Sequence, residues 1–293
     1  MTPSAHMSRS GNPRHSRRGG CQPCDDPLDS GESLLLAPLL ADPRASAIIL
    51  DFDGTIAKIV DDPADAVALP GAEATLRALS ELFGTVGVVS GRPVDFLADR
   101  LAGAGSSLRL VGLYGIETIE AGRRRVVPEA QQWLAAVASV VDRARREAPA
   151  GVRVEDKGLS VALHWRKHPE AAPWARAAAE AAAESTGLVI VEARMAVELR
   201  PPVRADKGTV VEQLAIGCMA ACFAGDDSGD LAAFEALDRL ALRGLQTLRI
   251  AVASAETPRA LLEVADHSVA SPEDLLALLN SLAALAGGPV PHS

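Results

Sequence analysis

The sequence predicts an α/β fold, a doubly wound parallel sheet with a smaller α+β domain inserted into it. Short apolar runs that read as buried strands alternate with segments of helical periodicity, and this alternation is typical of parallel sheets covered by helices. The first run, 47–50, is followed at once by acidic residues and a glycine. Because ligands bind beyond the carboxyl ends of such strands, the same run also predicts where the chemistry lies.

The core elements follow one another in the order that a doubly wound sheet requires. The expected strands end near Phe52, Ser90, Leu113 and Ala224, with later strands at 248–252 and 267–269. The expected helices cover 72–82, 94–101, 207–214, 230–237, 258–264 and 272–285. The last helix has a typical start, because Ser271 can cap it and Pro272 suits its first position.

Two segments differ from this core. Segment 117–200 contains short alternating strands and two alanine-rich helices, which together predict a small two-layer α+β domain. Its strands are expected at 152–155, 159–164, 188–192 and 195–199, and its helices at 128–147 and 169–185. The first residues are rich in arginine and poor in apolar side chains. We therefore expect a disordered tail at 1–32, a catalytic core at 33–116 and 201–287, and an inserted domain at 117–200.

Asp51 and Asp53 are the strongest candidates for chemistry. Side chains two apart along a strand share a face, so these two carboxylates are expected to lie close together. Their mutual repulsion favours a cation between them, and Mg²⁺ prefers carboxylates, water and phosphate oxygens. An ordinary turn explains the motif almost as well. A calcium loop does not, because residues 55–58 fail to continue its pattern of oxygen ligands.

Three further segments carry side chains that suit phosphate. The second strand ends in Ser90 and Gly91, whose hydroxyl and backbone N–H groups can hold phosphate oxygens. Lys207 begins a helix-like run and supplies a point charge. The turn after a later strand carries three carboxylates, Asp226, Asp227 and Asp230. A turn serine, a solvated lysine and a capped helix start would explain each segment singly, but their joint occurrence favours one phosphate site.

These four segments resemble the four motifs of haloacid-dehalogenase-type phosphatases, over about residues 47–285. Within that superfamily the chain looks most like the trehalose-6-phosphate phosphatases. The closer resemblance lies in Gly-Leu-Tyr-Gly-Ile-Glu at 112–117, Glu-Asp-Lys at 155–157, His-Trp-Arg at 164–166 and Glu-Leu-Arg-Pro at 198–201. The chain departs from the family pattern at Tyr114, where histidine is usual, and at Trp165, where tyrosine is usual.

The resemblance implies a role for each candidate residue. Asp51 would be the nucleophile that forms an aspartyl-phosphate, and Asp53 would serve as acid and then as base. Ser90 and Lys207 would complete the catalytic set by fixing the phosphoryl oxygens. The implied Mg²⁺ site consists of Asp51, Asp53, Asp226 and Asp230. The implied substrate-binding residues are Gly91, Arg92, Glu155, Lys157, His164, Arg166, Glu198 and Asp227, and the inserted domain would be a cap that closes over the core.

The leading hypothesis is therefore a Mg²⁺-dependent phosphatase acting on trehalose 6-phosphate. The alternatives are the same chemistry on a related phosphosugar or pseudo-disaccharide phosphate, and a non-catalytic sugar-phosphate sensor. The sensor is disfavoured because all the expected acids are present. A net charge of −9 and only 3% aromatic residues argue against nucleic-acid and anionic-membrane partners. No apolar run suits a secretory signal, so we expect a cytoplasmic protein, and we expect a monomer.

Overall fold

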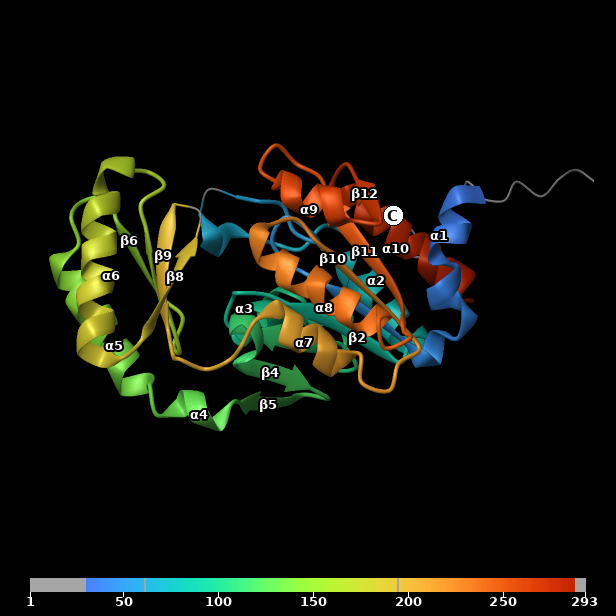
Figure 1. Ribbon diagram of the computed structural model, residues 1–293, viewed down its shortest axis with the longest axis horizontal. Helices are drawn as coiled ribbons and strands as arrows, with labels where there is room; N and C mark the ends of the chain where they lie inside the picture. Colours follow the sequence, from blue (N-terminus) through green and yellow to red (C-terminus); the bar gives the residue numbers. More distant parts are fainter. Residues whose placement is uncertain (1–29, 61, 194, 288–293) are drawn as a thin grey trace, which may run out of the picture.

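An eight-stranded sheet forms the centre of the larger unit of the computed structural model, which describes residues 30–60, 62–193 and 195–287 (Figure 1). Its strand order is β12–β11–β10–β1–β2–β3–β4–β5. The strands from β12 to β3 are parallel, whereas β4 and β5 run antiparallel at one edge. The strands are β1 (Ser46–Leu50), β2 (Thr85–Val89), β3 (Arg109–Gly112), β4 (Glu117–Glu120), β5 (Arg123–Val126), β10 (Ala220–Gly225), β11 (Gln246–Val252) and β12 (His267–Val269).

Helices cover both faces of this sheet, as the sequence predicted. The helices on one face are α1 (Ser30–Ala41), α2 (Ala72–Leu82), α3 (Val94–Arg100) and α10 (Pro272–Leu285). The helices on the other face are α7 (Lys207–Leu214), α8 (Leu231–Ala241) and α9 (Arg259–Val264). Strand β1 is buried from both sides, because Ile48 packs against the first set and Ile49 against the second. The doubly wound α/β fold is thus confirmed.

The chain changes direction across the sheet at β1. From β1 it proceeds to β2 and β3 on one side, and it returns much later to place β10 on the other side. Residues Ser46–Leu50 of β1 pair in parallel register with Ala220–Ala224 of β10. Such a reversal of strand order opens a crevice beyond the carboxyl ends of the two strands.

The boundary of the inserted domain lies later than we expected. Strands β4 and β5 pair with β3 in the large sheet, although the sequence analysis assigned residues 117–126 to the inserted domain. They form a hairpin whose two-residue turn, Ala121 and Gly122, has positive φ angles of 48° and 71°. The expected strands do not include 117–126, and the alternation of side chains in a hairpin does not tell which sheet it joins.

Helix α1 is a second departure from expectation. Residues 30–32, assigned to a disordered tail, begin this helix, and residues 1–29 lie outside the described part of the chain. Leu36 and Leu39 of α1 are fully buried in the core cluster that also contains Leu50. The apolar run at 34–40 is therefore a core helix.

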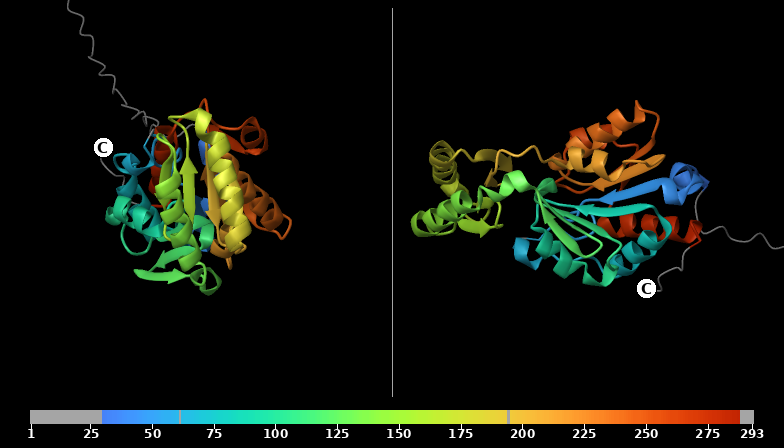
Figure 2. Two further views of the ribbon diagram at one scale, coloured as in Figure 1. Left: turned by 90° about the vertical axis from the view of Figure 1, so that its left-hand side faces the viewer. Right: turned by 90° about the horizontal axis from the view of Figure 1, so that it is seen from below.

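The smaller unit is the cap, residues 134–200. Its antiparallel sheet has the order β6–β7–β9–β8, formed by β6 (Arg153–Asp156), β7 (Val161–His164), β8 (Val189–Ala193) and β9 (Ala196–Arg200). Helices α5 (Leu134–Glu147) and α6 (Ala172–Thr186) pack on the side of this sheet that faces away from the core (Figures 1 and 2). Two connections join cap to core, one through the short helix α4 (Pro128–Gln131) and one after β9. The helix predicted at 128–147 is thus two helices, α4 and α5.

Period-two alternation gives the cap sheet two different faces. Leu163 of β7 and Val197 of β9 are buried against α5 and α6. Their neighbours His164 and Glu198 point the other way and line a cavity toward the core. The same strands therefore supply the cap's hydrophobic core and a polar inner face.

Among the described residues, no helix combines the length and the apolar character that crossing a membrane requires.

The packing of α1 yields a test of its place in the core. Leu39→Ala should lower the free energy of unfolding by about 2–5 kcal/mol, because it leaves a cavity under the sheet. Leu34→Ala, on the same helix, is the matched control: Leu34 is 78% exposed against 1% for Leu39, so its loss should cost less than about 0.5 kcal/mol. Urea denaturation measures both, and equal losses would show that α1 is not part of the core.

Candidate active site

Asp51 and Asp226 directly follow the neighbouring strands β1 and β10. The backbone N–H of Asp51 donates to the carbonyl oxygen of Ala224 at 2.9 Å, so strand pairing continues up to Asp51. Gly54 lies in the left-handed region at φ 74°, and a Cβ atom there would lie 2.2 Å from Oδ2 of Asp226. Only glycine therefore lets the turn after β1 approach the turn after β10 so closely.

Lys207 is buried between two of the carboxylates. Its Nζ atom donates to Oδ1 of Asp51 at 2.8 Å and to Oδ1 of Asp230 at 2.5 Å, and only 3% of its side chain is exposed. Burial alone would lower the pKa of Lys207, but these two carboxylates raise it well above its ordinary value. The lysine starts α7, where Asp206 forms a capping box with Thr209. The hydrogen-bonded N-terminus of α7 thus fixes a permanently charged ammonium group in the site.

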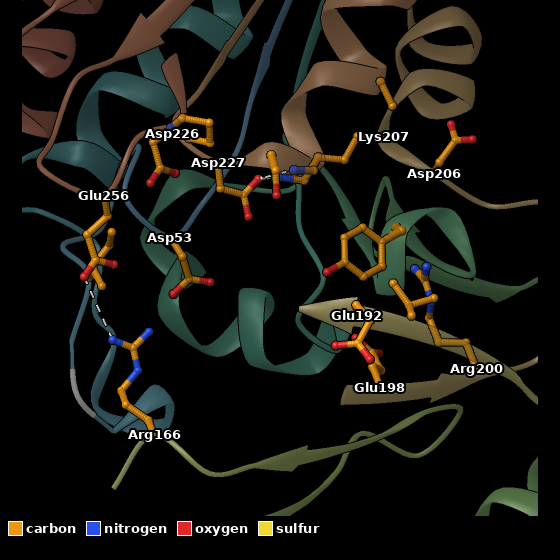
Figure 3. Close-up of a pocket in the computed structure, with 17 residues that line it drawn as sticks. Asp53, Arg166, Glu192, Glu198, Arg200, Asp206, Lys207, Asp226, Asp227 and Glu256 are labelled. Carbon is orange, nitrogen blue, oxygen red and sulfur yellow. Dashed lines mark hydrogen bonds and ion pairs between the residues drawn. The ribbon is translucent and has the colours of Figure 1, made fainter. Parts of the chain in front are cut away.

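Asp230 organises the turn that carries the other acids. Its Oδ2 atom accepts hydrogen bonds from the backbone N–H groups of Asp226 (2.9 Å) and Asp227 (3.0 Å), while its Oδ1 atom accepts from Lys207. Gly225 permits this closure, because a Cβ atom there would lie 2.3 Å from the Asp230 carboxyl carbon. Asp227 is the more exposed member, with its carboxylate 3.9 Å from Lys207 (Figure 3).

The loop after β2 is hydrogen-bonded to two residues with strained backbone conformations, Leu113 and Tyr114. Leu113 and Tyr114 have positive φ angles of 49° and 59°, which cost about 1–2 kcal/mol each for side chains of this kind. In this conformation the Tyr114 N–H donates to the carbonyl oxygen of Ser90 at 3.0 Å, and the Leu113 N–H donates to that of Arg92 at 2.9 Å. Ser90 is buried in the same cavity as Asp51 and Lys207. The backbone of the loop is therefore fixed at the wall of this cavity.

Asp53 is paired with Arg92. The guanidinium donates from Nε to Oδ2 at 2.9 Å and from Nη2 to Oδ1 at 2.7 Å, a two-point interaction. The third nitrogen, Nη1, lies 3.9 Å from Oε1 of Glu155 on the cap. Asp51 and Asp53 both line the smaller cavity, although they lie in the turn after β1 and not in the strand itself.

The inner face of the cap presents a buried ion pair. Lys157 Nζ lies 3.4 Å from Glu198 Oε2 and donates to the carbonyl oxygen of Gly91 in the core at 3.3 Å. Ser160 donates to Glu198 Oε1 at 2.6 Å, which fixes that carboxylate. Burial would lower the pKa of Lys157, but Glu198 raises it above its ordinary value. The charged groups of this face are therefore held at fixed positions.

Glu155 and His164 form the second pair of this face. The ring Nε2 of His164 lies 2.8 Å from Glu155 Oε2. Burial tends to raise the pKa of Glu155, but the His164 hydrogen bond and the charge of Lys157 prevail and hold it at about 2. Arg166 lies farther out, 4.0 Å from Glu256 of the core (Figure 3).

Two adjoining cavities, of about 190 and 450 Å³, separate the cap from the core. Both are lined by Asp53, Tyr114, Glu198, Lys207 and Asp227. The smaller one reaches Asp51 and Ser90, and the larger one extends to Arg166 and Glu256. The smaller cavity at the strand ends thus opens into a larger polar space beneath the cap.

The comparison with protein families decides what this arrangement is. The family model described as trehalose-phosphatase matches residues 49–266, more than half of the 293-residue chain. The chain belongs to the trehalose-phosphatase family.

Curated relatives of this trehalose-phosphatase chain have similar names. It is 33% identical over 216 residues to a trehalose-phosphate phosphatase of Mycolicibacterium paratuberculosis, a match that covers 70% of this chain and 54% of the relative. It is 35% identical over 219 residues to a probable trehalose-phosphate phosphatase of Sinorhizobium fredii, covering 72% and 80%. The chain thus spans about half the length of the mycobacterial relative.

A solved structure titled as a trehalose-6-phosphate phosphatase related protein superposes with a TM-score of 0.69 at 26% identity, covering 82% of this chain and 97% of that one. The C-terminal domain of the Candida albicans trehalose-6-phosphate phosphatase gives 0.68 at 22% identity, covering 86% and 96%, and shows the shared fold. The expected fold of core and cap is confirmed by these neighbours.

Sequence reasoning missed part of this trehalose-phosphatase site. Tyr114 lines both cavities, and the guanidinium of Arg200 lies 4.6 Å above its ring. Glu256 lies in the loop after β11 and lines the larger cavity, but it is not part of any sequence motif. Trp165, the other departure from the family pattern, is buried among the apolar residues of the cap. Of the two departures, therefore, only Tyr114 reaches the site.

The acidic residues of the trehalose-phosphatase site suit a divalent cation. Asp51, Asp226 and Asp230 are buried, and one oxygen from each lies within 4.8 Å of the others. Burial and mutual repulsion raise the pKa of Asp51 above its ordinary value, that of Asp226 to about 8 and that of Asp230 to about 6. A cluster of this kind binds either protons or a cation. The side chain of Asp53, which turns to Arg92, is not part of the cluster.

These raised pKa values yield a prediction about cation binding. At pH 7 the Asp226 carboxyl is largely protonated in the metal-free protein, since its pKa is about 8. A cation displaces that proton, so titration with MgCl₂ should release roughly one proton per ion. Calorimetry at pH 7 in two buffers of different ionisation enthalpy measures the release, which should become small at pH 9. A binding heat that is the same in both buffers at pH 7 would contradict the expectation.

Proposed function

We propose that this trehalose-phosphatase family member is a magnesium-dependent phosphatase that hydrolyses trehalose 6-phosphate to trehalose and phosphate. The observation that carries the proposal is the buried contact of Lys207 with Asp51, at the strand ends and beneath a polar cap face. This contact orients a carboxylate and supplies a positive charge where a phosphate dianion would approach. The names of the relatives support the choice of sugar.

Asp51 is the nucleophile in this mechanism. Lys207 binds Oδ1, which leaves Oδ2 to attack the phosphorus atom. The bond from phosphorus to Oδ2 forms while the bond from phosphorus to the sugar oxygen breaks, giving an aspartyl-phosphate. Ser90 and Lys207 hold the phosphoryl oxygens and offset the charge that develops on them.

Asp53 handles the protons in both halves of the reaction. It gives a proton to the departing sugar oxygen, which would otherwise leave as an unstable alkoxide. As a carboxylate it then takes a proton from the water that attacks phosphorus, which restores Asp51 and releases phosphate. Asp53 borders both cavities, so its position suits contact with the leaving oxygen.

The magnesium ion would be held by Asp51, Asp226 and the backbone carbonyl of Asp53. Asp230 would orient Lys207 and the bound water. When bound, the ion neutralises the phosphate dianion enough for a carboxylate to approach it. Three carboxylates, those of Asp51, Asp227 and Asp230, lie within 3.9 Å of the Lys207 ammonium group, and a cation would offset their mutual repulsion.

The cap selects the sugar in this proposal. Glu198, Lys157 and Glu155 face the cavity with their charges already paired, so hydroxyl groups of the sugar can exchange hydrogen bonds with them at low cost. A phosphate ester without such hydroxyls would leave these groups less well satisfied. Discrimination among sugars thus comes from the cap, and the chemistry comes from the core.

Tyr114 favours a second candidate, the same reaction on a related phosphosugar. Its ring replaces the histidine that is usual in the family and forms part of the wall between the two cavities. A larger, less polar wall changes which sugar hydroxyls find partners.

Phosphate release with Mg²⁺ from trehalose 6-phosphate, sucrose 6-phosphate, glucose 6-phosphate and p-nitrophenyl phosphate tests the function. We expect kcat/KM for trehalose 6-phosphate to exceed the others by about a hundredfold, which corresponds to roughly 3 kcal/mol of discrimination. Asp51→Asn should lower turnover below about 1% of wild type, because it lacks the nucleophile. A preference for another phosphosugar would support the second candidate, and no release from any substrate would refute the phosphatase.

The assignment of the cap gives a separate prediction. Lys157→Ala should reduce kcat/KM for trehalose 6-phosphate by about a hundredfold, but that for p-nitrophenyl phosphate by less than about fivefold, because only the first of these substrates carries a sugar that can reach this lysine. Arg145→Ala is the control, since Arg145 is a cap cation on α5 that is half exposed and paired with Asp156. Equal losses on both substrates in Lys157→Ala would mean that the lysine does not contact the sugar.

A further inference from the structure

Arg92 donates hydrogen bonds to both carboxylate oxygens of Asp53, the proposed acid and base. Nε and Nη2 lie 2.9 and 2.7 Å from the two oxygens of Asp53. That carboxylate nevertheless borders both cavities, and Figure 3 shows it at the larger one. To transfer a proton, an oxygen of Asp53 must come within about 2.6–3.2 Å of the sugar oxygen or the attacking water. The observed pair therefore has to open before Asp53 can act.

The backbone of Arg92 is fixed, so any movement of this residue must come from its side chain. Its backbone is held at both ends, because its N–H donates to Ser90 Oγ at 3.2 Å and its carbonyl accepts from Leu113 at 2.9 Å. The guanidinium lies 4.8 Å above the ring of Phe96, and only 12% of the side chain is exposed. A flat aromatic surface lets the guanidinium turn in its plane while keeping its cation–π contact.

Glu155 provides a second acceptor within reach. Its Oε1 atom lies 3.9 Å from Nη1 of Arg92, and its Oε2 atom is held by His164 at 2.8 Å. Glu155 belongs to β6 of the cap, whereas Asp53 belongs to the core. The pKa of about 2 keeps Glu155 negatively charged at any working pH. A small rotation thus moves Arg92 from a core carboxylate to a cap carboxylate.

We propose that Arg92 is a switch that links cap and chemistry: it holds Asp53 inactive until Glu155 of the seated cap takes the guanidinium over. The switch rests on the proposed function, because it regulates the acid and base step of that reaction. Once released, an oxygen of Asp53 can approach the sugar oxygen that receives the proton in the proposed reaction as the bond from phosphorus to that oxygen breaks. Arg92 is a positioning residue in this scheme, since it acts through Asp53.

The switch predicts an unusual pattern in a double-mutant cycle. Glu155→Gln removes the negative charge of the second acceptor and leaves Arg92 on Asp53, so kcat for trehalose 6-phosphate should fall at least about tenfold. Adding Arg92→Gln removes the lock, so the double variant should have a kcat at least about threefold higher than Glu155→Gln alone. If both residues only bind the sugar, the second change lowers activity further, and that result would overturn the switch.

A matched control exists elsewhere in the core. Arg249 makes the same two-point contact with Asp266, from Nε to Oδ2 at 3.0 Å and from Nη2 to Oδ1 at 2.6 Å. It lines neither cavity. Arg249→Gln should therefore not restore kcat in the Glu155→Gln background, and recovery with both arginine variants would refute a specific role for Arg92.

Two further measurements separate the possible failures. If Arg92→Gln does not give a cooperative thermal transition, Arg92→Lys replaces it, because one ammonium group cannot bind both oxygens of Asp53 in the same way. Lack of recovery in that folded variant would overturn the switch. Wild-type release of phosphate from trehalose 6-phosphate is measured in the same series. An active wild type without recovery refutes the switch alone, whereas an inactive wild type refutes the proposed function and the switch with it.

Discussion

The site depends on one buried ammonium group. Burying the charge of Lys207 is unfavourable unless carboxylates surround it, and Asp51 and Asp230 do so at 2.8 and 2.5 Å. Because the lysine begins α7, these contacts tie a helix on one face of the sheet to the ends of β1 and β10. The two glycines beside the acids then become necessary, since any side chain at Gly54 or Gly225 would separate the turns that Lys207 draws together.

The alternation of side chains along the cap strands gives the cap sheet its two faces. Because side chains alternate along β7 and β9, each residue that packs under α5 and α6 is followed by one that faces the core. The polar inner face is therefore held by the cap's own hydrophobic core, which keeps Glu198 and His164 in fixed positions. Cap and core touch through polar contacts, Lys157 with the Gly91 carbonyl, Arg166 with Glu256, and Arg153 with Asp62. They also share a small apolar cluster, in which Leu159 of the cap is buried with Leu113 and Ile116 of the core.

Much of this could be predicted from the sequence, for reasons that are local. The apolar runs before Asp51, Ser90 and Asp226 mark buried parallel strands, and parallel strands bring their carboxyl ends to one edge of the sheet. The convergence of these residues with Lys207 follows from that geometry. The roles assigned to them are still predictions, as is the identity of the metal ion.

What escaped prediction depends on contacts between distant segments. The hairpin at Glu117–Val126 has the same alternation whichever sheet it joins, so its place beside β3 had no local signal. Helix α1 contains Pro38 and is short, and it owes its stability to burial of Leu36 and Leu39. The pairing of Arg92 with Asp53, 39 residues apart, required the fold itself. Trp165 appeared to concern the substrate, but its side chain fills the cap.

The pairing of β1 with β10 also determines when the protein can finish folding. During synthesis β1 emerges from the ribosome early, but its partner strand β10 (Ala220–Gly225) emerges only after the entire cap has been made. The cap contains its own sheet, helices and apolar cluster within residues 134–200, so its contacts are local and form sooner. Until β10 arrives, one edge of β1 is open and its apolar residues Ile48 and Ile49 lack part of their cover. The central strand of the core is thus the part of the nascent chain that depends longest on protection from aggregation.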